Sequence, residues 1–215
     1  QKKDEALFDY TKRFDKVRLN ALRITQTQIK DAYQLVSKDF IEAIHLAKHN
    51  IKTFHTFQKP QDWQQSPSPG VYYGWRYTPL DSVGLYVPGG RAIYPSSVLM
   101  NAIPANIAGV SRVVMVSPPQ ANGQIDPSVL VAADCCGIEE VYAVGGAQAI
   151  FALAYSTQSI NKVDKIVGPG NQFVNLAKQL VYGQVDIDKP AGPSEVLVVL
   201  ESENYVAFAA AEMLA

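Results

Sequence analysis

The chain contains 215 residues, of which 47% are apolar and 18% are charged, and its formal net charge at pH 7 is −1. This composition excludes a disordered chain, and the near-neutral charge argues against a dedicated nucleic-acid binder. No apolar run approaches the ~20 residues that a membrane-spanning helix needs. We therefore expect one large or two small folded domains, with no nucleic-acid partner and no membrane partner.

The N-terminal third carries helical patterns, at residues 5–16 and again further along. Apolar side chains recur from Ile29 to Phe54 at steps of three and four, which predicts one long helix with a single apolar face. Thr25 followed by Gln28 is typical of a capping box at its start. Residues 58–70 are polar and rich in proline, and we interpret them as a loop or linker, whereas residues 71–78 favour a strand.

From residue 82 onward, short β-rich runs alternate with alanine-rich helical runs. Such alternation is typical of βαβ crossovers. The sequence therefore predicts an α/β fold: a Rossmann-like parallel sheet with flanking helices, preceded by a long N-terminal helical segment. The predicted strands are 82–87, 112–117, 140–144, 164–167 and 196–200, and the predicted helices are 96–108, 127–136, 147–155, 172–180 and 205–215.

The two cysteines, Cys135 and Cys136, are neighbours in the sequence. A disulfide between adjacent residues is strained and rare, so the pair favours a reducing, cytoplasmic setting. Both lie in a helix that is predicted to pack on the sheet. We interpret them as small buried apolar residues rather than as reactive thiols.

Glycine-rich turns follow three of the predicted strands. They are Pro88-Gly89-Gly90, Gly145-Gly146-Ala147-Gln148 and Gly168-Pro169-Gly170-Asn171. In open α/β sheets, ligands bind at the carboxyl ends of the strands, where the next helix offers its N-terminus to an anion. Each turn alone is often only a tight connection, and a third fingerprint glycine is missing because Phe173 stands in its place. Together with the polar side chains of Tyr86, Gln148 and Asn171, they predict a ligand crevice.

Two other features have weaker chemical interpretations. His45 and His49 are spaced as zinc ligands often are, but we interpret them as surface or packing residues, because no acidic residue joins them. The run 186–195 is rich in proline and glycine. It is either a turn in which Ser194 bonds its own backbone or a rigid loop that presents a hydroxyl group and the Glu195 carboxylate.

These motifs together resemble the histidinol dehydrogenases, and the resemblance extends in order over essentially the whole chain. Beyond the turns quoted above, it includes Asp4-Glu5-Ala6-Leu7 and Phe54-His55-Thr56. It is carried by Ser82-Val83-Gly84-Leu85-Tyr86-Val87-Pro88-Gly89-Gly90, Val144-Gly145-Gly146-Ala147-Gln148-Ala149-Ile150, Val163-Asp164-Lys165-Ile166-Val167-Gly168-Pro169-Gly170-Asn171 and Asp188-Lys189-Pro190-Ala191-Gly192-Pro193-Ser194-Glu195-Val196.

The resemblance implies an activity, cofactors and site residues. Enzymes of this family oxidise L-histidinol to L-histidine through histidinaldehyde, reduce two NAD+ and bind zinc. They are homodimers whose sites draw residues from both subunits. By motif, Tyr86, Gln148 and Asn171 are the expected NAD contacts, and Ser194 is an expected substrate contact.

One departure lies at the end of the chain. In the family, the last helix continues into Gln-Ala-Glu-His, where the Gln and His bind zinc, and the proton-transferring Glu-His pair and further zinc ligands follow. This sequence stops at Ala215. We therefore expect the N-terminal half of such an enzyme, with no catalytic residue and no metal ligand, and inactive by itself. Residues 196–215 should then be poorly ordered or paired with another molecule, and not fully buried by their own chain.

The predicted organisation has three parts. Residues 1–80 form a helical segment and linker of an incomplete first domain, residues 81–194 form the NAD-binding domain, and residues 195–215 begin the continuation of the first domain. Two alternatives stay open. One is a stand-alone nucleotide-binding or assembly module without catalysis, and the other is a dehydrogenase that acts on a different amino alcohol.

Overall fold

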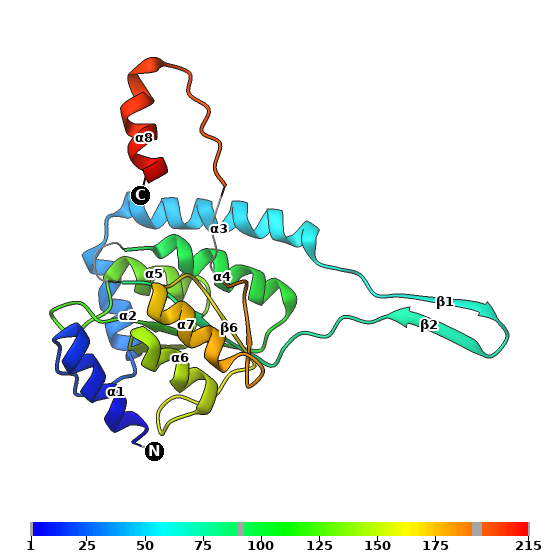
Figure 1. Cartoon of the computed structure of the whole chain (residues 1–215), viewed down its shortest axis with the longest axis horizontal. Helices are drawn as coiled ribbons and strands as arrows, with labels where there is room; N and C mark the ends of the chain where they lie inside the picture. Colours follow the sequence, from blue (N-terminus) through cyan, green and yellow to red (C-terminus); the bar gives the residue numbers. More distant parts are fainter. Residues whose placement is uncertain (1, 90–92, 191–194, 215) are drawn as a thin grey trace.

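The protein is an α/β structure built on a five-stranded parallel sheet (Figure 1). The computed structural model describes residues 2–89, 93–190 and 195–214. The strand order is β5-β4-β3-β6-β7, so the chain adds strands on one side of β3 and then continues on the other side. This architecture confirms the predicted fold class. The strands are β3 (Ser82–Tyr86), β4 (Arg112–Ser117), β5 (Glu140–Ala143), β6 (Lys165–Val167) and β7 (Asp186–Ile187).

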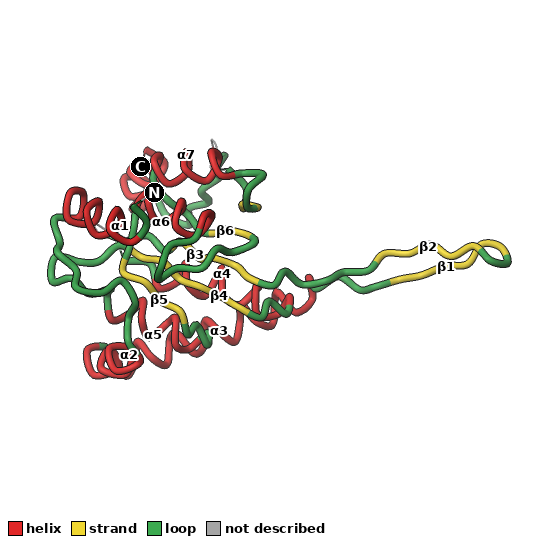
Figure 2. The backbone as a smooth tube through the Cα atoms, turned by 90° about the horizontal axis from the view of Figure 1, so that it is seen from below, coloured by secondary structure: helices red, strands yellow, loops and turns green. Residues whose placement is uncertain are grey.

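Helices cover both faces of this sheet (Figure 2). Val114 and Val116 of β4 pack with α1, α6 and α7, whereas Met115 between them packs with α2, α3, α4 and α5. Strands that are buried on both faces are continuous apolar runs, which explains why the sequence located most of them. The helices are α1 (Asp4–Tyr10), α2 (Gln26–Ala32), α3 (Lys38–Gln58), α4 (Pro95–Ala108), α5 (Pro127–Cys135), α6 (Gly146–Tyr155) and α7 (Gln172–Val181).

The prediction of one long helix from Ile29 to Phe54 is wrong, because the stripe is divided between α2 and α3. Thr25 caps α2 with the predicted capping box. The chain becomes extended at Val36, with φ −117°, and Ser37 then caps α3 by accepting a hydrogen bond from the amide of Phe40. Ser37 is a second N-cap signal inside the stripe. Both helices pack on the same face of the sheet, so one apolar period continues across the break.

The expectation of a loop across 58–70 is wrong for its second half. Residues 63–68 form β1 (Trp63–Ser68), which pairs antiparallel with β2 (Val71–Trp75). Gly70, at φ +82°, provides the tight turn between them. The ribbon projects from the body of the protein, and every one of its residues is exposed (Figures 1 and 2). Proline is tolerated in such a strand because its edge pairs with nothing else in the described structure.

Removing the ribbon is expected to leave the stability of the sheet domain almost unchanged. The carboxylate of Asp62 accepts a hydrogen bond of 2.8 Å from the amide of Tyr77, so a short glycine-serine linker can replace residues 63–76. We expect a loss below about 1 kcal/mol, or a shift in Tm of less than about 4 °C, by differential scanning calorimetry. Ile44→Ala, which truncates a buried side chain of α3, should cost about 2–5 kcal/mol in the same assay. A fall of 10 °C on removing the ribbon would contradict its independence.

The chain past α7 differs most from expectation. The two-residue strand β7 was not predicted, and the strand predicted at 196–200 is wrong, because the structure gives these residues no strand pairing. Leu197 is 87% exposed and leads to α8 (Val206–Leu214), whose Phe208 is 75% exposed. Apolar runs predict strands only where a neighbouring strand is available to pair with them. The exposure of 196–200 and α8 agrees with the expectation that their own chain does not bury them.

Candidate functional site

The carboxyl ends of β3 and β6 meet where the strand order reverses, and a glycine turn lies there. Gly168 follows β6 with φ +113°. A Cβ atom at this position would lie 2.1 Å from the carbonyl oxygen of Tyr86 in β3. Only glycine therefore allows the two strand ends to approach this closely. In open α/β sheets, such a reversal point is the usual place for a ligand.

A second glycine turn, after β5, is tied to the same strand end. The amide of Gly146 donates a hydrogen bond of 3.1 Å to the phenol oxygen of Tyr86. Tyr86 is 4% exposed, and burial raises the pKa of its phenol group, so the hydroxyl stays neutral. The sequence analysis predicted that the hydroxyl group of Tyr86 faces the ligand crevice. The structure instead shows that its oxygen holds the start of α6, so any contact with a ligand would be added to that role.

The other two predicted cofactor contacts lie at the starts of helices. Gln148 is half-buried in the first turn of α6, where its amide group lies against Gly146. Asn171 is the N-cap of α7, and its Oδ1 accepts hydrogen bonds from the amides of Phe173 at 3.0 Å and Val174 at 3.1 Å. The structure thus brings Tyr86, Gln148 and Asn171 to one edge of the sheet. The fourth, Ser194, lies outside the described residues.

Sequence reasoning missed a buried charge at the same edge. Lys178 of α7 is 4% exposed, and its ammonium group pairs with the carboxylate of Asp188, directly after β7. The signal was present, because Lys178 lies four residues after Val174 and three before Val181, on the buried face of the helix. Next to this pair is a pocket of about 240 Å³ that includes Gly168, Pro169 and Gly170.

The residues with weaker interpretations lie elsewhere. His45 and His49 are exposed on α3, and the described part of the chain contains no group of three or more His, Cys, Asp or Glu residues that could hold a metal ion. Burial raises the pKa of the Cys136 thiol to about 11. A thiol with this pKa is protonated at neutral pH, which fits its interpretation as a buried apolar residue.

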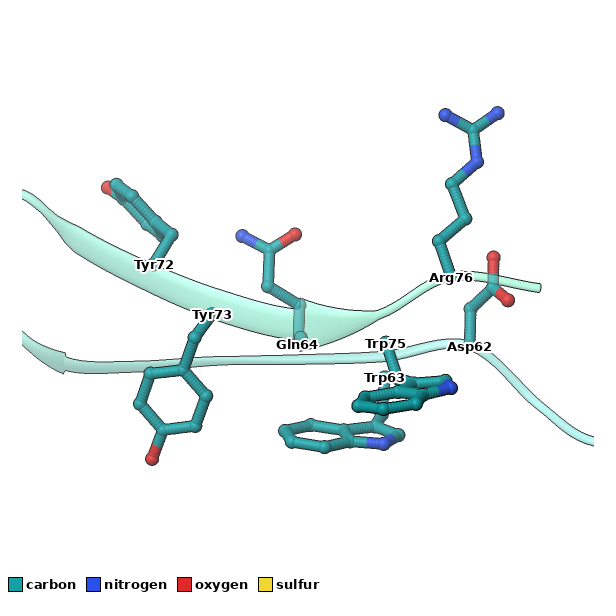
Figure 3. A pocket seen from close by; sticks show the side chains of 8 residues that line it. Asp62, Trp63, Gln64, Tyr72, Tyr73, Trp75 and Arg76 are labelled. Atoms are coloured by element: carbon teal, nitrogen blue, oxygen red, sulfur yellow. The ribbon is translucent and has the colours of Figure 1, made fainter. Parts of the chain in front are cut away.

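A larger pocket, of about 500 Å³, lies on the β1–β2 ribbon (Figure 3). Trp63, Tyr73 and Trp75 extend from one face of the ribbon, and Tyr72 and Gln64 extend from the other. The rings of Trp63 and Tyr73 meet edge to face, with centroids 6.1 Å apart. This pocket is lined by the two strands of the ribbon and the residues beside them, without a helix N-terminus among its lining residues, and it lies away from the sheet edge (Figure 1). We therefore place the candidate site at the glycine turns.

Comparisons with known proteins identify the family of the chain. The family profile described as histidinol dehydrogenase matches residues 1–215. The chain is 54% identical over 214 residues to histidinol dehydrogenase from Thermosynechococcus vestitus, which covers 99% of this chain and 50% of that protein. It is 51% identical over 211 residues to histidinol dehydrogenase from Clostridium acetobutylicum, covering 98% of this chain and 49% of that protein.

A solved structure gives the same result in three dimensions. The crystal structure of histidinol dehydrogenase from Elizabethkingia anophelis superposes with a TM-score of 0.85 at 43% identity, and the match covers 89% of this chain and 44% of that one. The chain thus spans about half the length of the relatives it matches. Since the profile matches the full 215 residues, the chain belongs to the histidinol dehydrogenase family.

Proposed function

We propose that this chain is the NAD-binding part of an enzyme that oxidises L-histidinol to L-histidine through histidinaldehyde, acting in the cytoplasm as a homodimer. The observation that supports it best is a backbone cradle at the point where the strand order reverses, formed by the turn at 168–171 and the N-termini of α6 and α7. There, Gly168 closes against Tyr86, and the N-termini of α6 and α7 lie at the same edge. Backbone amides at helix N-termini favour phosphate groups, and glycine lets a phosphate approach the backbone closely.

The residues at this edge fit a dinucleotide. A bound NAD+ would supply the acceptor for the hydride of the alcohol carbon. The chain's own contribution is to bind and orient it: Asn171 keeps the first turn of α7 ordered, and Tyr86 fixes the start of α6 through Gly146. Gln148 offers an amide group beside that turn. These are contacts that set position, and none of them transfers a proton.

Zinc fits the described residues poorly. They contain no group of three or more metal-ligating side chains, so we derive no step through a metal from this chain. In our proposal the zinc ligands and the general base belong to the half of the relatives' length that this chain does not span.

None of the helices in the described part of the chain has both the length and the apolar composition of a membrane span.

Asn171→Ala tests the cofactor part of the proposal. The substitution removes the side-chain oxygen that accepts two amide hydrogen bonds at the start of α7, which should cost about 1 kcal/mol of stability. Isothermal titration calorimetry with NAD+ should show binding to the unsubstituted chain and at least tenfold weaker binding to the variant.

The matched control is Ser37→Ala, which removes the N-cap of α3 away from the sheet edge. It should lower stability by a similar amount and leave the affinity for NAD+ unchanged. An unsubstituted chain that shows no heat of binding would contradict NAD binding by this half of the protein. Turnover of histidinol by the full-length protein, compared with other amino alcohols, tests the substrate.

A further inference from the structure

The buried charge of Lys178 needs a physical explanation. Lysine is among the residue types that are almost never fully buried, and an unpaired buried charge is strongly unfavourable. Lys178 lies on the packed face of α7 beside Val174, Ala177 and Val181, where an apolar side chain would normally stand. Its ion pair with Asp188 offsets part of the desolvation cost. Replacement of such a pair by apolar residues is often neutral for stability, so stability alone does not explain why the pair is there.

The contacts of this pair converge on one residue. The ammonium group of Lys178 donates a hydrogen bond of 3.0 Å to the carbonyl oxygen of Gly168. The carboxylate of Asp188 accepts a hydrogen bond of 2.8 Å from the amide of the same Gly168, and its other oxygen pairs with the ammonium group. Both backbone polar groups of Gly168 are therefore held by a single ion pair, which joins the end of β6 to α7 and to the chain after β7.

Gly168 is the residue whose conformation the cradle depends on. Its φ of +113° is one of many that a glycine can adopt in the absence of restraint. β6 ends at Val167, so the ladder of the sheet does not hold the turn. A pocket of about 240 Å³ is lined by Gly168 and Gly170 together with Lys178 and Asp188.

We propose that Lys178 and Asp188 are positioning residues, whose ion pair fixes the Gly168 peptide so that turn 168–171 and the first turn of α7 present the shape that receives the cofactor's diphosphate. The inference rests on the proposed function, because it assigns a role at the same site. Neither residue needs to touch the cofactor. Their effect passes through the two hydrogen bonds to Gly168.

The test compares Lys178→Met with Lys165→Met. Lys165 forms an ion pair of 2.7 Å with Asp186, so it joins the same two strands, β6 and β7, but none of its hydrogen bonds in the described structure is to Gly168. Calorimetric titration with NAD+, well below the unfolding temperature, should show at least tenfold weaker binding for Lys178→Met. Binding to Lys165→Met should stay within twofold of the unsubstituted chain. A purely structural role would lower Tm without this loss of affinity.

Amide hydrogen exchange of Gly168, followed by NMR, gives a readout that does not require NAD+. Exchange should be at least tenfold faster in Lys178→Met than in Lys165→Met. If the unsubstituted chain does not bind NAD+, the proposed function fails, and the exchange rates still decide whether the pair holds the turn. Unchanged affinity together with unchanged exchange in Lys178→Met would overturn the inference. Should that variant not fold, Lys178→Met combined with Asp188→Asn removes both charges and is measured in the same way.

Discussion

Gly168→Ala is expected to be among the most damaging single substitutions in this chain, with a loss of about 3–5 kcal/mol in the free energy of unfolding. The added Cβ would lie 2.1 Å from the carbonyl oxygen of Tyr86. That oxygen belongs to β3, which pairs with β4 on one side and β6 on the other, so it cannot move away without disturbing the centre of the sheet. A φ of +113° is also strained for any residue with a side chain. Urea denaturation followed by circular dichroism measures the loss, and binding of NAD+ should be abolished.

Gly183→Ala separates the two causes of that loss. Gly183 has φ +93°, but its Cβ would meet nothing within 4 Å. Its substitution therefore carries backbone strain without a collision, and should cost only about 1–2 kcal/mol. If Gly168→Ala were no more destabilising than Gly183→Ala, the close approach of β6 to β3 would not be what requires glycine at position 168.

The sequence predicted correctly those strands that can be recognised from their own residues, without reference to a pairing partner. The strands at 82–86, 112–117 and 140–143 are buried on both faces, and a continuous apolar run indicates such a strand without knowledge of its neighbours. Errors arose where a partner decides the outcome. Within the described residues, 63–68 pair with 71–75 and with no other strand, across a turn set by Gly70, and their polar composition concealed the strand. Residues 196–200 have a strand's composition, but none of the strands in the described part of the chain pairs with them.

The candidate site was predictable in place but not in detail. Glycine turns after β-rich runs indicate the carboxyl edge of a parallel sheet, because parallel strands must all end there. The pattern does not give the direction of side chains, so it did not show that the Tyr86 hydroxyl bonds Gly146. It also did not reveal the pairing of Lys178 with Asp188, because that contact depends on how α7 packs against the end of β7.

Leu153→Ala is expected to cost about 2–5 kcal/mol, and Gly84→Ala about 1–3 kcal/mol, when each is made alone. Leu153 is fully buried between α6 and the sheet. A Cβ on Gly84 would lie 2.9 Å from Leu153 Cδ1 and 3.1 Å from Val163 Cγ2. The backbone of Gly84 has no positive φ, so glycine is required here for space rather than for conformation. Chemical denaturation of the two single variants measures these losses.

The double variant, Gly84→Ala with Leu153→Ala, should lose less stability than the sum of the two single losses, by about 1 kcal/mol or more. The new methyl group enters the space that the leucine side chain leaves, and only the contact with Val163 remains tight. Ile29→Ala provides the control, because Ile29 packs on the opposite face of the sheet and should combine with Gly84→Ala additively, within about 0.5 kcal/mol. Additive losses for Gly84 and Leu153 would mean that the two residues do not share that space. The missing side chain at position 84 would then not be the reason that α6 packs closely on β3. That packing is what brings the start of α6 to the glycine turns.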